Sequence, residues 1–282
     1  MLRLTTLGSG SAGNSALVES GGTRLLLDAG LSAKQIRLRL EALDVALDSI
    51  SGVLITHEHI DHAGALAVLC KKHDIPIYCN AMTSEVLRRD FLPNHKNWRL
   101  FETGRAFSVG SLEIESFSVP HDAVDPVGYV IRDGSGALGV LTDMGYATKM
   151  AIERVREAHT VLIETNHDEQ MLQADTKRPW SVKQRILSRH GHLSNDAAGA
   201  VARELMGSGN IQRFVLGHLS RDCNSSELAI EAVARALGFN PAELPEGFEI
   251  FCASQGERSP TFSVTNSVQP KQAPTDVQTR LF

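Results

Sequence analysis

The sequence has few cysteines, and their spacing excludes two classes of small fold. The four present in 282 residues are Cys70, Cys79, Cys223 and Cys252. They form no C-x-x-C pair of the kind that zinc ribbons use, and they are too sparse for a disulfide framework. We therefore interpret them as reduced thiols in a cytoplasmic protein.

Long apolar runs and an excess of positive charge are also missing. No segment approaches the ~18 uninterrupted apolar residues that a membrane-spanning helix needs, and MLRLTTLGSGSAGNS at the start contains no apolar signal region. The formal net charge of −5 excludes a histone-like general binder of nucleic acid. We expect a soluble globular protein without membrane contact, in which any contact with a polyanion depends on a local patch.

What the sequence does contain is an alternation of short apolar runs and amphipathic segments. Short apolar runs predict strands at 2–7, 16–20, 23–28, 53–56, 75–79, 98–101, 106–109, 112–119, 127–132, 137–142, 160–164, 212–216 and 248–252. Helical spacing predicts helices at 33–43, 63–73, 82–90, 148–158, 181–190, 195–206 and 226–238. Both halves mix strands and helices, which predicts an α/β domain over 1–263, with two sheets face to face and helices outside.

Three glycines near the start form a G-x-G-x-x-G pattern at Gly8, Gly10 and Gly13. A dinucleotide site would need a helix next, within a βαβ unit. Here the strand-like ALVES and the turn signal Gly21-Gly22 follow instead. We predict a tight turn between strands, with an anion-binding nest of bare amides as a weaker alternative.

The most informative stretch is VLITHEHIDHAG, residues 53–64. An apolar run stops there, and four metal-binding side chains follow within six positions: His57, His59, Asp61 and His62. Groups this dense repel like-charged neighbours and are costly when buried unsatisfied, and a divalent cation resolves both problems. We expect His57 and His59 to alternate as strand residues before a turn leads into a helix. The alternative, a polar surface turn, fits poorly directly after a buried strand.

This H-x-H-x-D-H run resembles the signature of the metallo-β-lactamase superfamily, whose fold is an αββα sandwich of two mixed sheets. The family's other metal positions are matched in order by His121 in FSVPHD, Asp143 in GVLTDMG and His218 in FVLGHLS. Asp28 in LLLDAG matches the aspartate that supports the ligand loop from behind the metal ligands.

The resemblance implies two divalent metals. One would be held by His57, His59 and His121, the other by Asp61, His62 and His218, with Asp143 bridging them. Two such metals activate a shared water, so the expected reaction is hydrolysis, with Asp61 also a catalytic residue. Nitrogen and oxygen ligands favour zinc, and manganese or iron are the alternatives.

The motif GHLS occurs twice, at 191–194 and 217–220. The second copy ends an apolar strand, which suits a metal ligand. The first opens a helix with Ser194 or Asn195 as its N-cap, where free amides can bind phosphate and His192 can protonate a leaving alcohol. The alternative is a histidine that merely satisfies a loop.

Two further segments indicate a nucleic-acid substrate. ETNHD, residues 164–168, ends a strand and places His167, a further catalytic candidate, at the same sheet edge as the metals. The basic stretch 176–189 supplies four candidate substrate contacts: Arg178, Trp180, Lys183 and Arg185. Basic side chains neutralise phosphates, and an exposed indole stacks on a base. The alternative is a solvated helix face with the indole in the core.

The motifs GSGSAGNS, THEHIDHAG, PHDAVDPVGY, ETNHD and the paired GHLS closely resemble the YycJ/WalJ-like branch of the superfamily. That resemblance implies a 5′-to-3′ exonuclease on double-stranded DNA with a role in repair. The long insertion of RNase J and CPSF-type nucleases is not seen in the sequence. A small-molecule phosphodiesterase or thioesterase of the same fold, or a non-catalytic metal-binding protein, stays an alternative.

Residues 264–282 differ in composition from the rest. They are poor in large apolar residues, so we predict a disordered tail. The closing QTRLF resembles the Q-x-x-L-F motif by which bacterial repair proteins dock on the sliding clamp. Leu281 and Phe282 would fill an apolar pocket, and the Gln278 amide would bond at its rim. Chance is the alternative for so short a motif.

A fluorescent peptide of residues 270–282 is expected to bind the sliding clamp with modest affinity, because Thr279 and Arg280 depart from the commoner middle residues. Replacing both apolar anchors, Leu281→Ala with Phe282→Ala, should abolish binding in an anisotropy titration. Binding that survives this double substitution would refute the motif.

Overall fold

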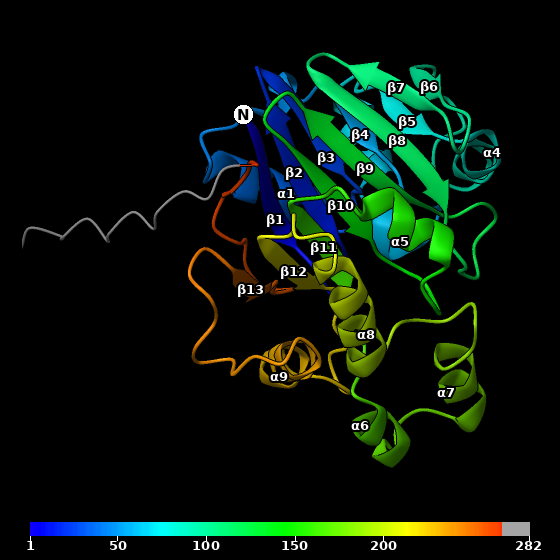
Figure 1. Ribbon diagram of the computed structural model, residues 1–282. Helices are drawn as coiled ribbons and strands as arrows, with labels where there is room; N and C mark the ends of the chain where they lie inside the picture. The colour runs from blue at the N-terminus through cyan, green and yellow to red at the C-terminus, as the bar shows by residue number, and fades with distance from the viewer. Residues whose placement is uncertain (267–282) are drawn as a thin grey trace, which may run out of the picture.

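Within residues 1–266, the part of the chain that the computed structural model describes, the protein forms two seven-stranded sheets packed face to face (Figure 1). In order across the first sheet lie β14 (Phe262–Val264), β1 (Leu2–Gly8), β2 (Ser15–Ser20), β3 (Thr23–Leu27), β4 (Gly52–Leu54), β5 (Ile77–Cys79) and β6 (Trp98–Leu100). In order across the second lie β13 (Glu249–Cys252), β12 (Arg213–Gly217), β11 (Thr160–Glu164), β10 (Gly136–Leu141), β9 (Val127–Asp133), β8 (Leu112–Ser118) and β7 (Ala106–Val109).

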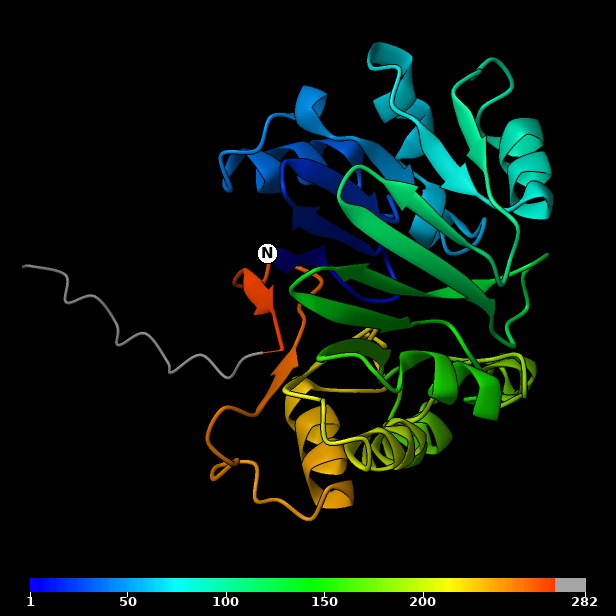
Figure 2. The same cartoon turned by 45° about the horizontal axis from the view of Figure 1, so that its top comes forward.

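Helices cover both outer faces, as Figure 2 shows from a second side. The first sheet packs on helices that include α1 (Ala33–Glu41), α3 (Leu66–Lys72) and α4 (Ala81–Asp90). The second packs on α5 (Lys149–Val155), α8 (Asn195–Met206) and α9 (Ser226–Ala236). The remaining helices are the 3-10 turn η1 (Leu47–Ser49), α2 (Ile60–Ala63), α6 (Glu169–Ala174) and α7 (Trp180–Ile186). This is the αββα sandwich predicted from the sequence.

The layers follow from the direction of the side chains, which point to opposite faces of the sheet at successive positions of each strand. In β3, Leu25 and Leu27 face the core between the sheets, while Leu26 faces the helices. In β11, a strand of the second sheet, Leu162 faces the core between the sheets, while Val161 and Ile163 face α5, α8 and α9. Strands buried on both faces therefore need the continuous apolar runs seen in the sequence.

The parallel strands β3, β4, β5 and β6 of one sheet, and β10, β11, β12 and β13 of the other, define the edge that matters for function. Asp28 follows β3, Glu164 ends β11 and His218 follows β12. Because ligand sites in α/β sheets form beyond the carboxyl ends of parallel strands, the polar residues that close these runs gather at one edge.

Three expectations about element boundaries need correction. Strand β4 ends at Leu54, so His57 lies in a loop and His59 is the N-cap of α2 rather than a strand residue. Helix α6 was not foreseen. Strand β14 pairs with β1, and the Asn266 amide bonds to the Ser135 carbonyl at 2.9 Å, so ordered structure continues past the expected boundary at 263.

Two other expectations concern the ends of the chain and the membrane. The predicted clamp-binding residues Gln278, Leu281 and Phe282 lie outside the described residues. Within residues 1–266, no helix combines the length and apolar character needed to cross a membrane.

Candidate metal centre

The side chains predicted to bind metal come together at the shared sheet edge. Among residues 1–266, four overlapping groups place their ligand atoms within 4.8 Å of one another. The groups are His57 with His59 and His121; Asp61 with His62 and His218; His57 with His62 and Asp143; and Asp143 with Glu164, His192 and His218. The first two are the triads expected from the sequence, and the third joins them. The structure therefore brings every predicted metal ligand into one site.

Asp143 lies between the two triads. Its Oδ2 is 3.2 Å from Nε2 of His62, and its Oδ1 is 3.3 Å from Nε2 of His218 and 3.9 Å from Nε2 of His121. The carboxylate is buried. It thus contacts histidines of both triads, which is the position a bridging ligand needs.

A strained backbone aims three of the carboxylate and imidazole groups. Asp28, Asp143 and His218 have φ of 59°, 54° and 58°, and each closely follows a strand. This left-handed conformation is uncommon for residues with a Cβ and costs about 1–3 kcal/mol. Such strain persists where the surrounding contacts hold the backbone in place, and it is found most often at functional sites. Here it turns each side chain from the strand end toward the site.

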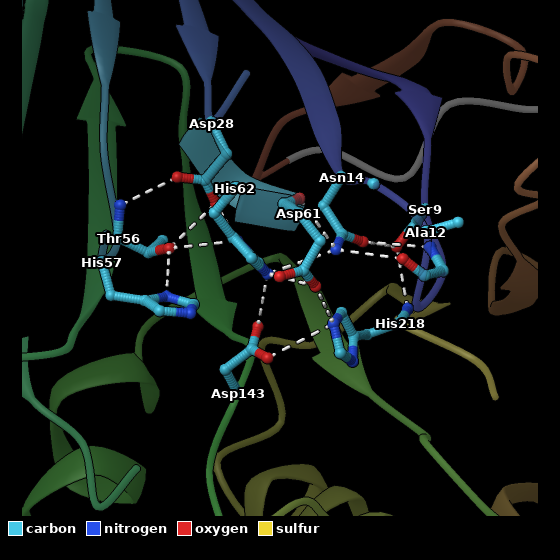
Figure 3. Close-up of polar contacts among 12 residues, drawn as sticks. Ser9, Ala12, Asn14, Asp28, Thr56, His57, Asp61, His62, Asp143 and His218 are labelled. Atoms are coloured by element: carbon cyan, nitrogen blue, oxygen red, sulfur yellow. Dashed lines mark hydrogen bonds and ion pairs between the residues drawn. The ribbon is translucent and has the colours of Figure 1, made fainter. Parts of the chain in front are cut away.

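Asp28 fixes the orientation of two histidines (Figure 3). Its Oδ1 accepts the Thr56 amide at 2.8 Å, and its Oδ2 accepts the Thr56 hydroxyl at 2.9 Å and Nδ1–H of His62 at 2.8 Å. Because the hydroxyl donates to Asp28, it accepts from Nδ1–H of His57, 3.0 Å away. Nε2 of each ring is left to face a metal. Asp28 occupies the supporting position expected of it.

The structure also supplies a test of whether metals fit. Nε2 of His57 and Nε2 of His121 are buried and make no hydrogen bond among residues 1–266. Nδ1 of His121 is committed to the Gly191 carbonyl at 3.1 Å. A buried polar atom without a partner costs about 1–3 kcal/mol, and a divalent cation accepting these lone pairs removes that cost. The residues present fit a metal.

Burial and charge divide the histidines into two kinds. Burial lowers the pKa of His57 well below its usual value and also lowers the pKa of His121, which favours neutral rings. Burial alone would lower the pKa of His62 and His218 as well, but the Asp143 carboxylate and other acidic neighbours outweigh it. They raise the pKa of His62 well above its usual value and that of His218 to about 10. These two rings hold protons that a metal must displace.

Glu164 is a site residue that the sequence did not reveal. Its Oε1 accepts Nδ1–H of His192 at 2.7 Å and of His218 at 3.0 Å, and its Oε2 accepts the Leu193 amide at 3.2 Å. Burial alone would raise its pKa, but the two imidazoles lower it to about 2, so it is ionised. Because its oxygens are used in these bonds, we assign Glu164 to orienting the rings. The available signal was an acidic residue closing the apolar run TVLIE.

The glycine-rich loop between β1 and β2 supports the site from the other side. Asn14 Nδ2 is 3.2 Å from Nε2 of His62, and Asn14 Oδ1 accepts the Ser9 hydroxyl at 2.9 Å. The Ser9 oxygen in turn accepts the His218 amide at 2.8 Å (Figure 3). Asn14 and Ser9 therefore connect one histidine of the second triad to the backbone of another.

The tight turn predicted for this loop is present, but the anion nest is not. The amides of Gly10, Ser11 and Gly13 donate within the protein, to the Asn14 side chain, the Leu219 carbonyl and the Gly10 carbonyl respectively. With these donors in use, the loop offers no set of free amides to an anion.

The start of α8 likewise differs from the expected phosphate site. Ser194 is the N-cap, as predicted, and its oxygen accepts the Ala197 amide. Its hydroxyl also bonds Glu169 at 2.9 Å, and the Asn195 amide donates to the His167 carbonyl. These partners, one of them a carboxylate, leave little for a phosphate to bind.

The structure encloses His167, for which the sequence predicted a catalytic role. The residue is only 1% exposed, and it is not among the residues that line the pocket over the metal centre. Its catalytic role stays a prediction. The sequence placed this residue at the correct sheet edge, but the side chain is enclosed there.

His192, in contrast, lines the pocket beside Asp61 and Asp143, and its side chain is partly exposed. Burial alone would lower its pKa, but the bonded Glu164 carboxylate outweighs this and raises it. Because Nδ1 is bonded to Glu164, Nε2 is the nitrogen left for a substrate. A proton held there suits a group that donates to a leaving oxygen.

The predicted basic stretch reaches the site through two arginines. The pocket, of about 250 Å³, is lined by Arg178 and Arg185 as well as by the metal-binding groups. Arg178 pairs with Asp175 at 2.8 Å and with Asp222 at 3.1 Å, so its charge is largely neutralised. Arg185 pairs with Asp122 but keeps 64% of its side chain exposed. Exposed pairs are weak, so Arg185 can exchange its partner for a phosphate.

The other two predicted substrate contacts stand elsewhere. Lys183 is buried, and its ammonium donates to the carbonyls of Gln173 and Asp175. It therefore joins α7 to α6, and the prediction that it contacts substrate is wrong. Trp180 is 63% exposed, which excludes the core alternative, but it is not among the pocket-lining residues. Figure 1 shows α6 and α7 projecting beyond α8.

Comparison with known families agrees with this geometry. A family model described as a beta-lactamase superfamily domain matches residues 23–219. The chain therefore belongs to the metallo-β-lactamase superfamily, as its sequence motifs and its fold both indicate.

Its relatives narrow the class further. The chain is 35% identical to exodeoxyribonuclease YycJ of Bacillus anthracis, over 88% of this chain and 94% of that protein. It is also 35% identical to exodeoxyribonuclease WalJ of Streptococcus pneumoniae serotype 2 (strain D39), over 92% of this chain and 96% of that protein. Among solved structures, the metallo-beta-lactamase fold protein YhfI from Bacillus subtilis matches 92% of this chain and 99% of its own, with a TM-score of 0.69 and 18% identity. That likeness shows the shared fold.

Metal binding is expected to release protons unequally from the two triads. The second triad holds protons on His62 and His218, whereas His57 and His121 of the first are neutral. Affinity for the second ion should therefore rise with pH by up to about tenfold per pH unit for each proton displaced. Calorimetric titration of metal-free protein with Zn²⁺, in buffers of different ionisation enthalpy, measures the protons. Release of none at the second step would contradict this assignment.

Proposed function

We propose that the protein is a two-metal exodeoxyribonuclease that removes nucleotides from the 5′ end of duplex DNA, in the cytoplasm and in a repair role. The observation that carries the proposal is the pocket in which Asp61, Asp143 and His192 meet Arg185. It joins metal ligands, a proton donor and a cation in a chain 35% identical to exodeoxyribonucleases over most of its length.

Divalent metals bound by the two triads would supply Lewis-acid activation of water and neutralise charge on the scissile phosphodiester. Zinc is the metal we propose, because imidazole nitrogens dominate the donor set; manganese and iron are the alternatives. The protein's own contributions are position and protons. Arg185 binds a phosphate oxygen, and His192, oriented by Glu164, protonates the departing 3′ oxygen.

One preparation assayed on three substrates, with and without a chelator, tests the function. Metal-dependent release of nucleotides from 5′-phosphorylated duplex DNA is the expected result. Turnover restricted to bis-p-nitrophenyl phosphate would indicate a small-molecule phosphodiesterase, and turnover restricted to S-lactoylglutathione a thioesterase. Hydrolysis of none of the three would indicate a non-catalytic metal-binding protein. Clamp docking by Gln278, Leu281 and Phe282 is a separate part of the proposal, tested by the tail peptide.

Asp61→Ala and His192→Ala are expected to lose activity in different ways. Removing Asp61 takes a carboxylate from the second triad, so one metal should be lost and turnover should fall by about 10³-fold or more. Removing His192 should slow turnover by about 10²-fold or more with both metals retained. Metal analysis and circular dichroism accompany the rate measurements. A folded Asp61→Ala protein with near-normal turnover would refute the two-metal mechanism, and metal loss in His192→Ala would make His192 a ligand.

Arg185→Gln is expected to weaken DNA binding and to lower the slope of log affinity against log salt by about 0.9, the contribution of one phosphate contact on B-DNA. The matched control is Arg203→Gln, the same change of charge on an exposed arginine in the last turn of α8, away from the pocket. Equal effects of the two substitutions would mean that Arg185 acts only through net charge. The metal content of Arg185→Gln is measured as a control, because Asp122, the partner of Arg185, lies 3.3 Å from Nε2 of the predicted ligand His121. It should equal that of the wild type.

A further inference from the structure

One apolar side chain stands at the mouth of the metal centre. Ile60 is the first residue of α2, between the metal-binding residues His59 and Asp61, and it lines the pocket. It is 71% exposed, more than any other large apolar side chain in residues 1–266. Single exposed apolar residues are common on protein surfaces. This one is unusual because it lies between two metal-binding residues and shares the pocket with Ile186.

The pocket is close in size to one nucleotide. Its volume is about 250 Å³, just below the range of about 300–1,000 Å³ typical of pockets that enclose a drug-sized molecule. A nucleotide is of that size, whereas a base pair adds the nucleotide of a second strand. The pocket therefore has room for one nucleotide unit.

Part of the metal centre is deeply placed. His57 and His62 are 0% exposed and Asp143 is 2% exposed, whereas His59 and Asp61 are partly exposed and line the pocket. A phosphodiester that approaches Asp143 enters the pocket, and while its nucleotide stays paired and stacked, the partner strand is drawn toward the rim as well. An unpaired nucleotide enters without moving the partner strand.

We infer that the terminal nucleotide of the cleaved strand is unpaired and drawn into the pocket, with Ile60 as an apolar wedge against its base. The inference rests on the proposed exonuclease function and specifies the form of DNA that the same site accepts. The pocket offers two kinds of surface, apolar from Ile60 and Ile186 and cationic from Arg185. A base has two apolar faces and its phosphate is anionic, so an unpaired nucleotide matches both surfaces, whereas the terminal pair of a duplex exposes only its outer face.

The energetic cost of extruding a nucleotide is lowest when its base is mismatched or already single-stranded. The wild-type enzyme should therefore act faster on a duplex whose 5′ nucleotide is mismatched than on one ending in A·T, and slowest on one ending in G·C. Ile60→Ser should lower the rate on the paired ends about tenfold more than on the mismatched end, the size expected when one aliphatic side chain loses its apolar contact.

The matched control is Val68→Ser, which removes another exposed β-branched side chain from the outward side of α3, at a residue that does not line the pocket. It should leave the order of the three ends unchanged. Both sites are exposed, so neither substitution should unfold the protein, and circular dichroism checks this.

A second readout does not depend on turnover. A duplex with 2-aminopurine at the 5′ end, protected by phosphorothioate linkages, becomes more fluorescent when that base leaves the stack. Wild-type protein should raise the signal, and Ile60→Ser should raise it less at equal occupancy, as judged by anisotropy. Equal rates on the three ends, or DNA binding with no fluorescence change, would overturn the wedge while leaving the nuclease proposal intact. Absence of any DNA hydrolysis by the wild type would instead defeat the proposed function.

Discussion

The site depends on one buried carboxylate. Asp28 accepts three hydrogen bonds, two from Thr56 and one from His62, and through the Thr56 hydroxyl it also sets the ring of His57. These two histidines belong to different triads. A single group at the end of β3 therefore fixes the relative orientation of both halves of the centre. Its left-handed backbone and its burial are local costs, which the packed sheet around it can sustain.

The sequence predicted the fold, and it predicted as metal ligands residues that the structure gathers at one sheet edge, for physical reasons. Strands such as TVLIE are buried on both faces, so their apolar runs are long enough to recognise, and the polar residue after each run lies at the functional edge by geometry alone. The dense run from His57 to His62 predicted a cation because so many metal-binding side chains directly after a buried strand are costly to leave unpaired.

The supporting residues were harder to predict because their roles depend on contacts between distant segments. Glu164 touches His192 and His218 from separate parts of the chain, and Asn14 meets His62 across 48 positions. No local pattern encodes such pairs. The prediction for Lys183 was wrong for a related reason. A basic residue in an amphipathic helix can face solvent or cap a neighbouring helix, and the packing of α7 on α6 decides between the two. Arg178 is a similar case. It pairs with Asp175 and Asp222, so a patch that looks basic in the sequence is nearly neutral there in the structure.

The pairing of β14 with β1 has a consequence for biogenesis. One edge of β1 pairs with β14, residues 262–264, which is synthesised long after β1. During synthesis that edge stays open until β14 has left the ribosome, and open edges invite pairing with other chains. The loop that follows β1 carries Ser9 and Asn14 and is tied down by Gln255, which bonds the Ala12 amide and the Gly13 carbonyl. In a nascent chain, every predicted metal ligand from His57 to His218 is therefore made before Gln255 and β14, which hold the supporting loop and its strand in place.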